Sequence, residues 1–212
     1  MRSRLDKLLE IAGARLNDSK PSLRAKFEEE AAALAAELLG LLYRKNGFYA
    51  FESALHVFPA KSTPTEMGLD DWNAPGCWRS AFDGMADGCL FFAEDAFGGQ
   101  FAMKPGGIYQ FDPETAEQEL LASDLETWAE ALLSGYEMLT GFPLAHEWQA
   151  RHGPIPSGKR LVPKLPFVLG GEFSADNLYL LDAVKGMRLR GRIATQIPDL
   201  PDGGELKIDI LD

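Results

Sequence analysis

The segment HGPIPSGKR at residues 152–160 has residue types that could bind a phosphate, because it matches most of the pattern G-x-x-x-x-G-K-[ST]. A phosphate-binding loop of this kind presents a run of backbone N–H groups and then a magnesium-binding hydroxyl at the start of a helix. Pro154 and Pro156 have no N–H to donate, and Arg160 occupies the position of the hydroxyl. We therefore interpret the segment as a proline-rich connection and not as an ATP or GTP site.

The histidine and cysteine residues lack the spacing of a metal site. His146 and His152 are six residues apart, whereas a zinc-binding pair on one helical face is four apart. His56 stands alone in an apolar run that is typical of a strand. Cys77 and Cys89 have no C-x-x-C spacing and are typical of free thiols in a reducing compartment. We expect no metal and no cofactor.

Three carboxylate pairs could perform acid–base chemistry: Asp70 with Asp71, Glu94 with Asp95, and Asp112 with Glu114. They fall at predicted strand ends and loops, where solvated carboxylates are usual, and no nucleophile or base pattern accompanies them. No serine lies in a G-x-S-x-G motif. We expect a protein without catalytic residues. A hydrolase that uses the acidic cluster is the alternative, and a pocket with two carboxyls, one of strongly raised pKa, would favour it.

Acidic residues are concentrated in the middle of the 212-residue chain, whose net charge is −11. Residues 28–150 contain five Lys and Arg against twenty-one Asp and Glu, a charge of −16, whereas residues 1–27 carry +4 and residues 151–212 carry +1. Nucleic-acid binding depends on Lys and Arg that neutralise phosphates, so no nucleic-acid partner is expected. A negative field speeds the encounter with a basic protein, although it can also serve solubility alone.

The sequence predicts helices in the N-terminal part of the chain. Helical spacing of leucines predicts a helix over residues 3–16, and Pro21 suits the first turn of a second helix that extends to about Tyr43. The tripeptide KNG then ends that helix. Residues 48–58 are aromatic and predict a loop and a strand, and a long, turn-rich connection with room for one short helix follows.

The middle of the chain carries the clearest strand signal. Three short runs at 89–94, 99–104 and 107–112 are separated by glycine-containing turns, which predicts an antiparallel meander. Leucines and a tryptophan on one face predict a helix over 114–139. No segment is long and apolar enough to span a bilayer, and the N-terminus lacks a signal-peptide block, so we expect a cytoplasmic protein without a membrane partner.

The C-terminal part is less regular. LAHEWQARH predicts a short helix, and FVLGG and LKIDIL predict strands; the apolar segment NLYLL lies between them. Between Asp182 and Ile197 the arginines alternate with apolar residues as in a strand, but other residues would equally line a helix, and both alternatives stay open.

Four segments resemble the SUKH superfamily, which contains the Smi and Knr cell-wall regulators, Syd and bacterial immunity proteins. They are LLYRKNGFYAFESAL at 41–55, LFFAEDAFGGQFAM at 90–103, GGIYQFDPETAE at 106–117 and LETWAEALL at 125–133. The resemblance covers about residues 40–140 and implies an α+β fold in which helices back a curved antiparallel sheet. We expect a single domain over 1–212, with an N-terminal helical pair at 1–45, a SUKH-like core at 46–140 and an α/β extension at 141–212 packed on that core.

The resemblance implies a cytoplasmic protein-binding module, and in bacteria an immunity protein that binds and blocks a toxin domain, often a nuclease. Such toxins are basic, which agrees with the acidic middle of this chain. We expect the basic partner to contact the acidic residues and aromatic anchors near the sheet-edge loops: Asp70, Asp71, Trp72, Trp78, Glu94, Asp95, Phe97, Asp112 and Glu114. A housekeeping scaffold or regulator with an endogenous partner is the alternative within the same fold.

Overall fold

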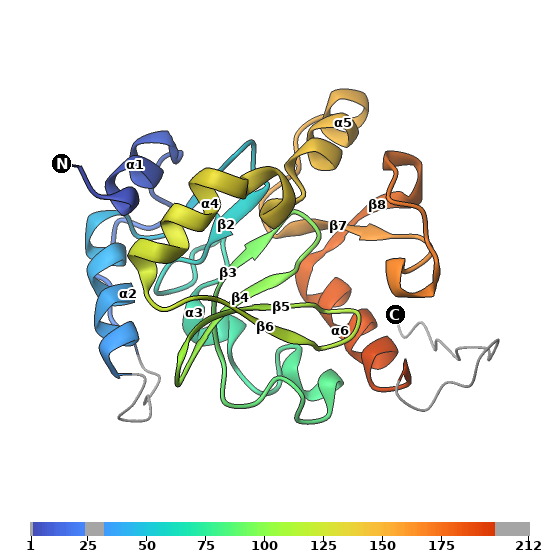
Figure 1. The fold of residues 1–212 in the computed structure, drawn as a ribbon, viewed down its shortest axis with the longest axis horizontal. Coiled ribbons are helices and arrows are strands. Elements are labelled where there is room, and N and C mark those ends of the chain that lie inside the picture. Colours follow the sequence, from blue (N-terminus) through green and yellow to red (C-terminus); the bar gives the residue numbers. More distant parts are fainter. Residues whose placement is uncertain (1, 24–31, 198–212) are drawn as a thin grey trace.

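The computed structural model describes residues 2–23 and 32–197 (Figure 1). Within them the helices are α1 (Arg4–Ile11), α2 (Ala32–Arg44), α3 (Leu69–Trp72), α4 (Leu125–Thr140), α5 (Phe142–His152) and α6 (Ala183–Ala194), with short 3-10 helices at Arg79–Phe82, Phe167–Leu169 and Ala175–Asn177. The strands are β1 (Phe48–Ala50), β2 (Leu55–Val57), β3 (Leu90–Asp95), β4 (Gln100–Lys104), β5 (Gly107–Phe111), β6 (Gln118–Ala122), β7 (Lys159–Pro163) and β8 (Leu178–Asp182).

The predicted α+β class is confirmed. Strands β1 to β6 form one open antiparallel sheet in chain order, and β7 pairs with β8 in a separate two-stranded sheet. Helices α1, α2 and α4 gather at one side of the large sheet, and β7, β8 and α6 lie toward its other end (Figure 1). None of the helices in the described residues is long and apolar enough to cross a membrane.

Both faces of the large sheet are covered, so all six residues of β3 are buried. On one face Phe92 and Phe101 contact Trp128 of α4, with ring centroids 5.0 and 5.7 Å apart. On the other face Phe91 packs at 4.9 Å from Trp78, which belongs to the turn-rich connection before β3. The connection thus supplies core side chains although it contains little regular structure.

The predicted helix over 114–139 is wrong in its first part, because residues 118–122 form strand β6 beside β5. Helix α4 begins at Leu125, where Asp124 and Thr127 form a reciprocal capping box. Pairing with the open edge of β5 satisfies the backbone groups of 118–122 and outweighs their moderate helix propensity.

The first predicted helix is shorter than expected and ends at Ile11. The backbone N–H of Gly13 donates to the carbonyl of Tyr49, and that of Leu16 donates to Asn46, so this segment follows the start of the sheet instead of continuing the helix. Of the second predicted helix, residues 24–31 lie outside the described residues, and α2 is described from Ala32.

The C-terminal part corrects two predictions and resolves one alternative. The segment FVLGG forms a 3-10 turn and not a strand, and a strand, β7, begins within the proline-rich connection, at Lys159. The segment LYLLD, for which no strand or helix was predicted, forms strand β8. The open segment forms helix α6, which Asp182 caps by accepting from the N–H of Lys185. The predicted strand LKIDIL lies outside the described residues.

A buried ion pair joins the two sheets. Arg160 of β7 lies 2.8 Å from the Oε1 atom of Glu94 on β3, and both side chains are almost fully buried. Burial alone would raise the pKa of Glu94, but Arg160 and His56 outweigh it and hold that pKa below its ordinary value. The backbone N–H of Leu161 also donates to the carbonyl of Ala96 at 3.0 Å. The C-terminal segment therefore belongs to the same packed structure as the sheet.

The ion pair predicts the effect of Arg160→Met. Removal of the guanidinium leaves the Glu94 carboxylate buried without its cation, so the free energy of unfolding should fall by about 3–5 kcal/mol in urea denaturation. The double variant Glu94→Gln/Arg160→Met removes both charges and should recover much of that loss. In the control Arg151→Met, the lost ion pairs are exposed and should cost less than about 1 kcal/mol. Equal costs for the two single variants would contradict this assignment.

Candidate binding site

A cavity of about 470 Å³ lies where the C-terminal segment meets the sheet. Its lining comes from the β3–β4 turn, residues 110–119 around the β5–β6 turn, residues 163–173 and helix α6. We name it the aromatic–acidic pocket, after the phenylalanines Phe97, Phe167 and Phe173 and the carboxylates Asp95, Asp112, Glu114, Glu117 and Glu119 that line it. Its size is in the range of about 300–1,000 Å³ that is usual for small-molecule binding sites.

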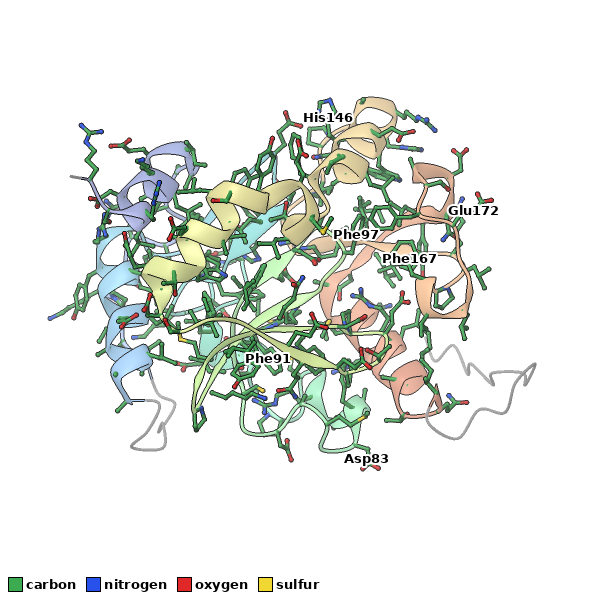
Figure 2. All side chains as sticks on the ribbon, in the orientation of Figure 1. Asp83, Phe91, Phe97, His146, Phe167 and Glu172 are labelled. Carbon is green, nitrogen blue, oxygen red and sulfur yellow. The ribbon has the colours of Figure 1, made fainter. Side chains whose placement is uncertain are left out.

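Three phenylalanines form one wall of the pocket. The ring centroids of Phe97 and Phe167 are 6.0 Å apart, and Phe173 lies 5.7 Å from the first and 5.1 Å from the second. Figure 2 shows Phe97 and Phe167 in the region between α4, α5 and the β7–β8 sheet. Gly141 at the end of α4 makes room for this wall, because a Cβ atom there would lie 2.1 Å from the Phe97 ring. Phe173 remains 67% exposed, so the wall reaches solvent.

Glu114 is a buried carboxylate of this pocket whose hydrogen-bonding capacity is only partly satisfied. Its Oε2 atom accepts from the backbone N–H of Val168 at 2.9 Å, whereas its buried Oε1 atom has no hydrogen-bond partner within residues 2–23 and 32–197. The side chain is only 5% exposed, and burial raises the pKa of Glu114. Asp112 fixes the local backbone by accepting from the N–H of Glu114 at 2.7 Å. A buried carboxylate oxygen without a partner is costly unless a ligand supplies one.

Asp95 holds the β3–β4 turn at the floor of the pocket. Its Oδ1 atom accepts from the backbone N–H groups of Phe97 and Gly99, each at 2.8 Å. Burial raises the pKa of Asp95 to about 7, although these hydrogen bonds and the charge of Arg190 act in the opposite direction. Gly99 is required beside this carboxylate, since a Cβ atom there would lie 2.3 Å from the Oδ2 atom.

Arg190 of α6 lies behind this turn with 2% of its surface exposed. Its guanidinium donates to the carbonyl of Phe97, and its Nε atom donates to the carbonyl of Gly186 at 3.1 Å. Gly98 has a φ of +79°, and a Cβ atom there would lie 2.5 Å from the guanidinium. The sequence identified Gly98 and Gly99 as a tight turn, but their contacts with Arg190 and Asp95 come from packing.

A second group of polar side chains lies beside β2 and β3, and all of them are buried except Tyr49, which is half-buried. We name this group the inner polar cluster, and its members are Tyr49, His56, Glu66, Glu94, Gln100 and Arg160. The Nδ1 atom of His56 lies 3.0 Å from Glu94, and its Nε2 atom lies 3.8 Å from Glu66 without a hydrogen bond. Tyr49 stacks on the imidazole at a centroid distance of 4.4 Å and donates its hydroxyl to Glu66 at 3.0 Å.

The inner polar cluster borders a cavity of about 270 Å³ but has the properties of a structural network. Burial lowers the pKa of His56, which favours the neutral imidazole, and only 2% of the residue is exposed. Glu94 is held by both His56 and Arg160. In the residues that the structure describes, no group of three His, Cys, Asp or Glu side chains could hold a metal ion.

The structure brings together four of the residues predicted to bind a partner. Asp95, Phe97, Asp112 and Glu114 all line the aromatic–acidic pocket. Asp71 is exposed and Asp70 half-buried on α3, which is not part of this pocket.

The expectation of exposed side chains is wrong for Trp72, Trp78 and Glu94, which are at most 1% exposed. The two tryptophans fill the core under the sheet, and Glu94 is bound by Arg160. Asp95 and Glu114 are also buried, but they line a cavity.

Sequence reasoning missed several residues that line the pocket, among them Glu117, Glu119, Phe167, Val168, Phe173 and Arg190. Their signal in the sequence is weak, because they are scattered over residues 117–190 and only the tertiary fold brings them together.

No family model matches the chain, and no curated protein matches it. Among solved structures, the fold is similar to that of Atu4351 from Agrobacterium tumefaciens, with a TM-score of 0.56 and 15% sequence identity over 87% of this chain and 86% of that chain. At this identity the similarity concerns the fold alone. The resemblance to the SUKH superfamily stays a prediction.

The buried carboxyl of Asp95 predicts a pH dependence of stability. Its folded-state pKa of about 7 lies above its ordinary value of 3.8, so the folded protein binds the proton more tightly between these values. The free energy of unfolding should therefore fall as pH rises from about 4 to about 7 and level off above that. Asp95→Asn keeps an oxygen acceptor for the turn and should lose this contribution, a few kcal/mol at most, since one pKa unit corresponds to about 1.4 kcal/mol.

Urea unfolding of both proteins across this pH range measures the difference. Asp83→Asn is the control, because Asp83 is exposed and lines neither the aromatic–acidic pocket nor the cavity beside the inner polar cluster. A difference between wild type and Asp95→Asn that stays constant with pH would contradict the raised pKa.

Proposed function

We propose that this protein is a non-enzymatic binding module that holds a basic protein partner over the aromatic–acidic pocket. The observation that carries the proposal is the composition of the pocket, in which five carboxylates and one buried guanidinium surround an aromatic wall that reaches solvent. Aromatic anchors that reach solvent beside a cavity are typical of interaction hot spots. A surplus of carboxylates selects a positively charged partner and speeds its approach.

An immunity protein that neutralises a toxin domain is the specific form of this proposal, and it would act in the cytoplasm. Toxin domains that cleave nucleic acids need basic surfaces to hold phosphates, and an acidic partner can occupy such a surface. The excess of acidic residues in the middle of the chain and the carboxylates of the pocket support this form. A housekeeping scaffold with an endogenous basic partner has the same surface requirement, and a toxin gene beside the gene for this protein would favour immunity over it.

One observation favours a hydrolase as the second candidate. The pocket contains two carboxyls with raised pKa values, Asp95 and Glu114, and such groups are suited to acid–base catalysis. The geometry weighs against it, because Asp95 uses its Oδ1 atom to hold two backbone N–H groups of the turn. A carboxyl that fixes a turn is less available for proton transfer to a substrate.

Co-expression with toxin domains from its own genome tests the function directly. Wild-type protein should restore growth, and the purified complex should weaken as salt increases. The double variant Glu117→Lys/Glu119→Lys reverses two carboxylates at the pocket and should bind at least about tenfold more weakly and fail to protect. Glu137→Lys is the matched control, because Glu137 is exposed on α4 and does not line the pocket.

Equal protection by the pocket variant and the control would assign the partner to another surface. Failure of every toxin domain to bind, together with capture of a defined endogenous basic protein, would favour the scaffold. Hydrolysis that is abolished by Asp95→Asn would establish the hydrolase instead.

A further inference from the structure

We propose that the aromatic–acidic pocket receives an arginine side chain of the partner, with its guanidinium on the Oε1 atom of Glu114. This inference deepens the function proposed above and depends on it for the source of the arginine. Neither the aromatic wall nor the exposed carboxylates of the pocket would by themselves define a site for one guanidinium. The buried and unpartnered oxygen of Glu114 is what marks the position of a donor.

Within the described part of the chain, only one of the two carboxylate oxygens of Glu114, Oε2, is held by a hydrogen bond. The Val168 N–H holds its Oε2 atom, so the carboxylate cannot turn away without loss of that hydrogen bond. Among the residues that the structure describes, no group hydrogen-bonds to the buried Oε1 atom. Burial raises the pKa of this carboxylate and outweighs the charge of Arg190 and the backbone N–H of Phe167, which lower it. A charged donor at this oxygen would offset a desolvation cost that the protein has already paid, and a charge-assisted hydrogen bond is stronger than a neutral one.

The wall beside Glu114 suits the flat, apolar faces of a guanidinium and its stem. Val168 and Phe173 are 40% and 67% exposed, and Phe167 and Phe97 continue the apolar surface inward. A guanidinium stacks on aromatic faces and is more weakly hydrated than an ammonium, so it loses less on entering such a site. These properties favour arginine over lysine.

The charge of the pocket excludes an anion and leaves room for one cation. Arg190 donates to the carbonyls of Phe97 and Gly186, so its charge faces the backbone behind the turn. The largest electrostatic interaction of Arg190 is with Glu114, followed by Asp95. Asp95 is partly protonated near pH 7, because its pKa is about 7. The carboxylates of Asp112, Glu114, Glu117 and Glu119 remain for a ligand.

The test uses the whole protein and three small probes: Nα-acetyl-arginine amide, the isosteric but uncharged Nα-acetyl-citrulline amide, and Nα-acetyl-lysine amide. Amide chemical shifts in an NMR titration should change at Phe167 and Val168 with the arginine probe, and its Kd should be on the order of millimolar for so small a ligand. The citrulline and lysine probes should bind at least about fivefold more weakly.

Two variants locate the site. Glu114→Gln keeps the shape and an acceptor for the Val168 N–H, and it should weaken arginine binding about tenfold. Phe173→Ser removes the exposed end of the wall and should weaken it about threefold. Glu137→Gln, an exposed change on α4, should leave binding unchanged. Thermal unfolding checks that all three variants are folded.

The outcomes separate the inference from the function. Equal binding of citrulline, tighter binding of lysine, or unchanged binding by Glu114→Gln would overturn the arginine site. Protection from a toxin that is lost in Glu117→Lys/Glu119→Lys but kept in Glu114→Gln would overturn it while leaving the proposed function intact. Arginine binding by a protein that protects against no toxin and binds no basic protein would support the pocket and overturn that function.

Discussion

Two buried arginines of the C-terminal segment determine how the rest of the molecule is arranged. Arg160 of β7 forms an ion pair with Glu94. Arg190 of α6 donates to the carbonyl of Phe97 in the β3–β4 turn, and Asp95 accepts a hydrogen bond from Gly99 in the same turn. The end of β3 is therefore met from two directions by cations that are at most 2% exposed. Because a buried charge without a partner is costly, this arrangement fixes the position of the C-terminal segment against the sheet. The pocket exists because that position leaves a space between them.

The same constraint separates structural carboxylates from those that face a ligand. Glu94 is surrounded by His56, Arg160 and Gln100, so its carboxylate oxygens are occupied within the protein and do not face a partner. Asp95 accepts a hydrogen bond from the β3–β4 turn and also lines the pocket. Glu114 keeps one oxygen unsatisfied, and Glu117 and Glu119 are solvated. A high density of acidic residues in a sequence therefore does not define a binding surface until burial and partners are known.

The sequence predicted the features that depend on local chemistry. Glycine-containing turns between apolar runs predicted the β3–β4–β5 meander. The α+β class, which the structure shows, was implied by the resemblance to a known family. It failed where distant backbone decides the outcome. Residues 118–122 have leucines that suit a helix, but the open edge of β5 takes them as a strand. The segment after Asp182 has arginines at alternate positions, as in a strand. In the structure Asp182 caps it as a helix, and Gly191 lets that helix pack closely against Ala81 and Phe82.

The candidate site was only half predictable for the same reason. Phe97, Asp112 and Glu114 could be selected because a turn-flanking aromatic and carboxylates are visible in the sequence, whereas Trp72 and Trp78 have the same residue type as interface anchors but fill the core. No local rule distinguishes a tryptophan in a core from one in an interface, because the difference lies in what the opposite segment covers.

The contribution of the C-terminal segment also bears on what the resemblance to a known family can mean. The resemblance covers about residues 40–140, a region that contains the large sheet and the acidic side of the pocket. The aromatic wall and the buried cation come largely from residues 163–190, beyond that region. A protein with the core alone would present the carboxylates with only Phe97 of the wall and without Arg190. The selectivity for a side chain that is both cationic and apolar must therefore come from this segment, and the charge of the core supplies only the attraction.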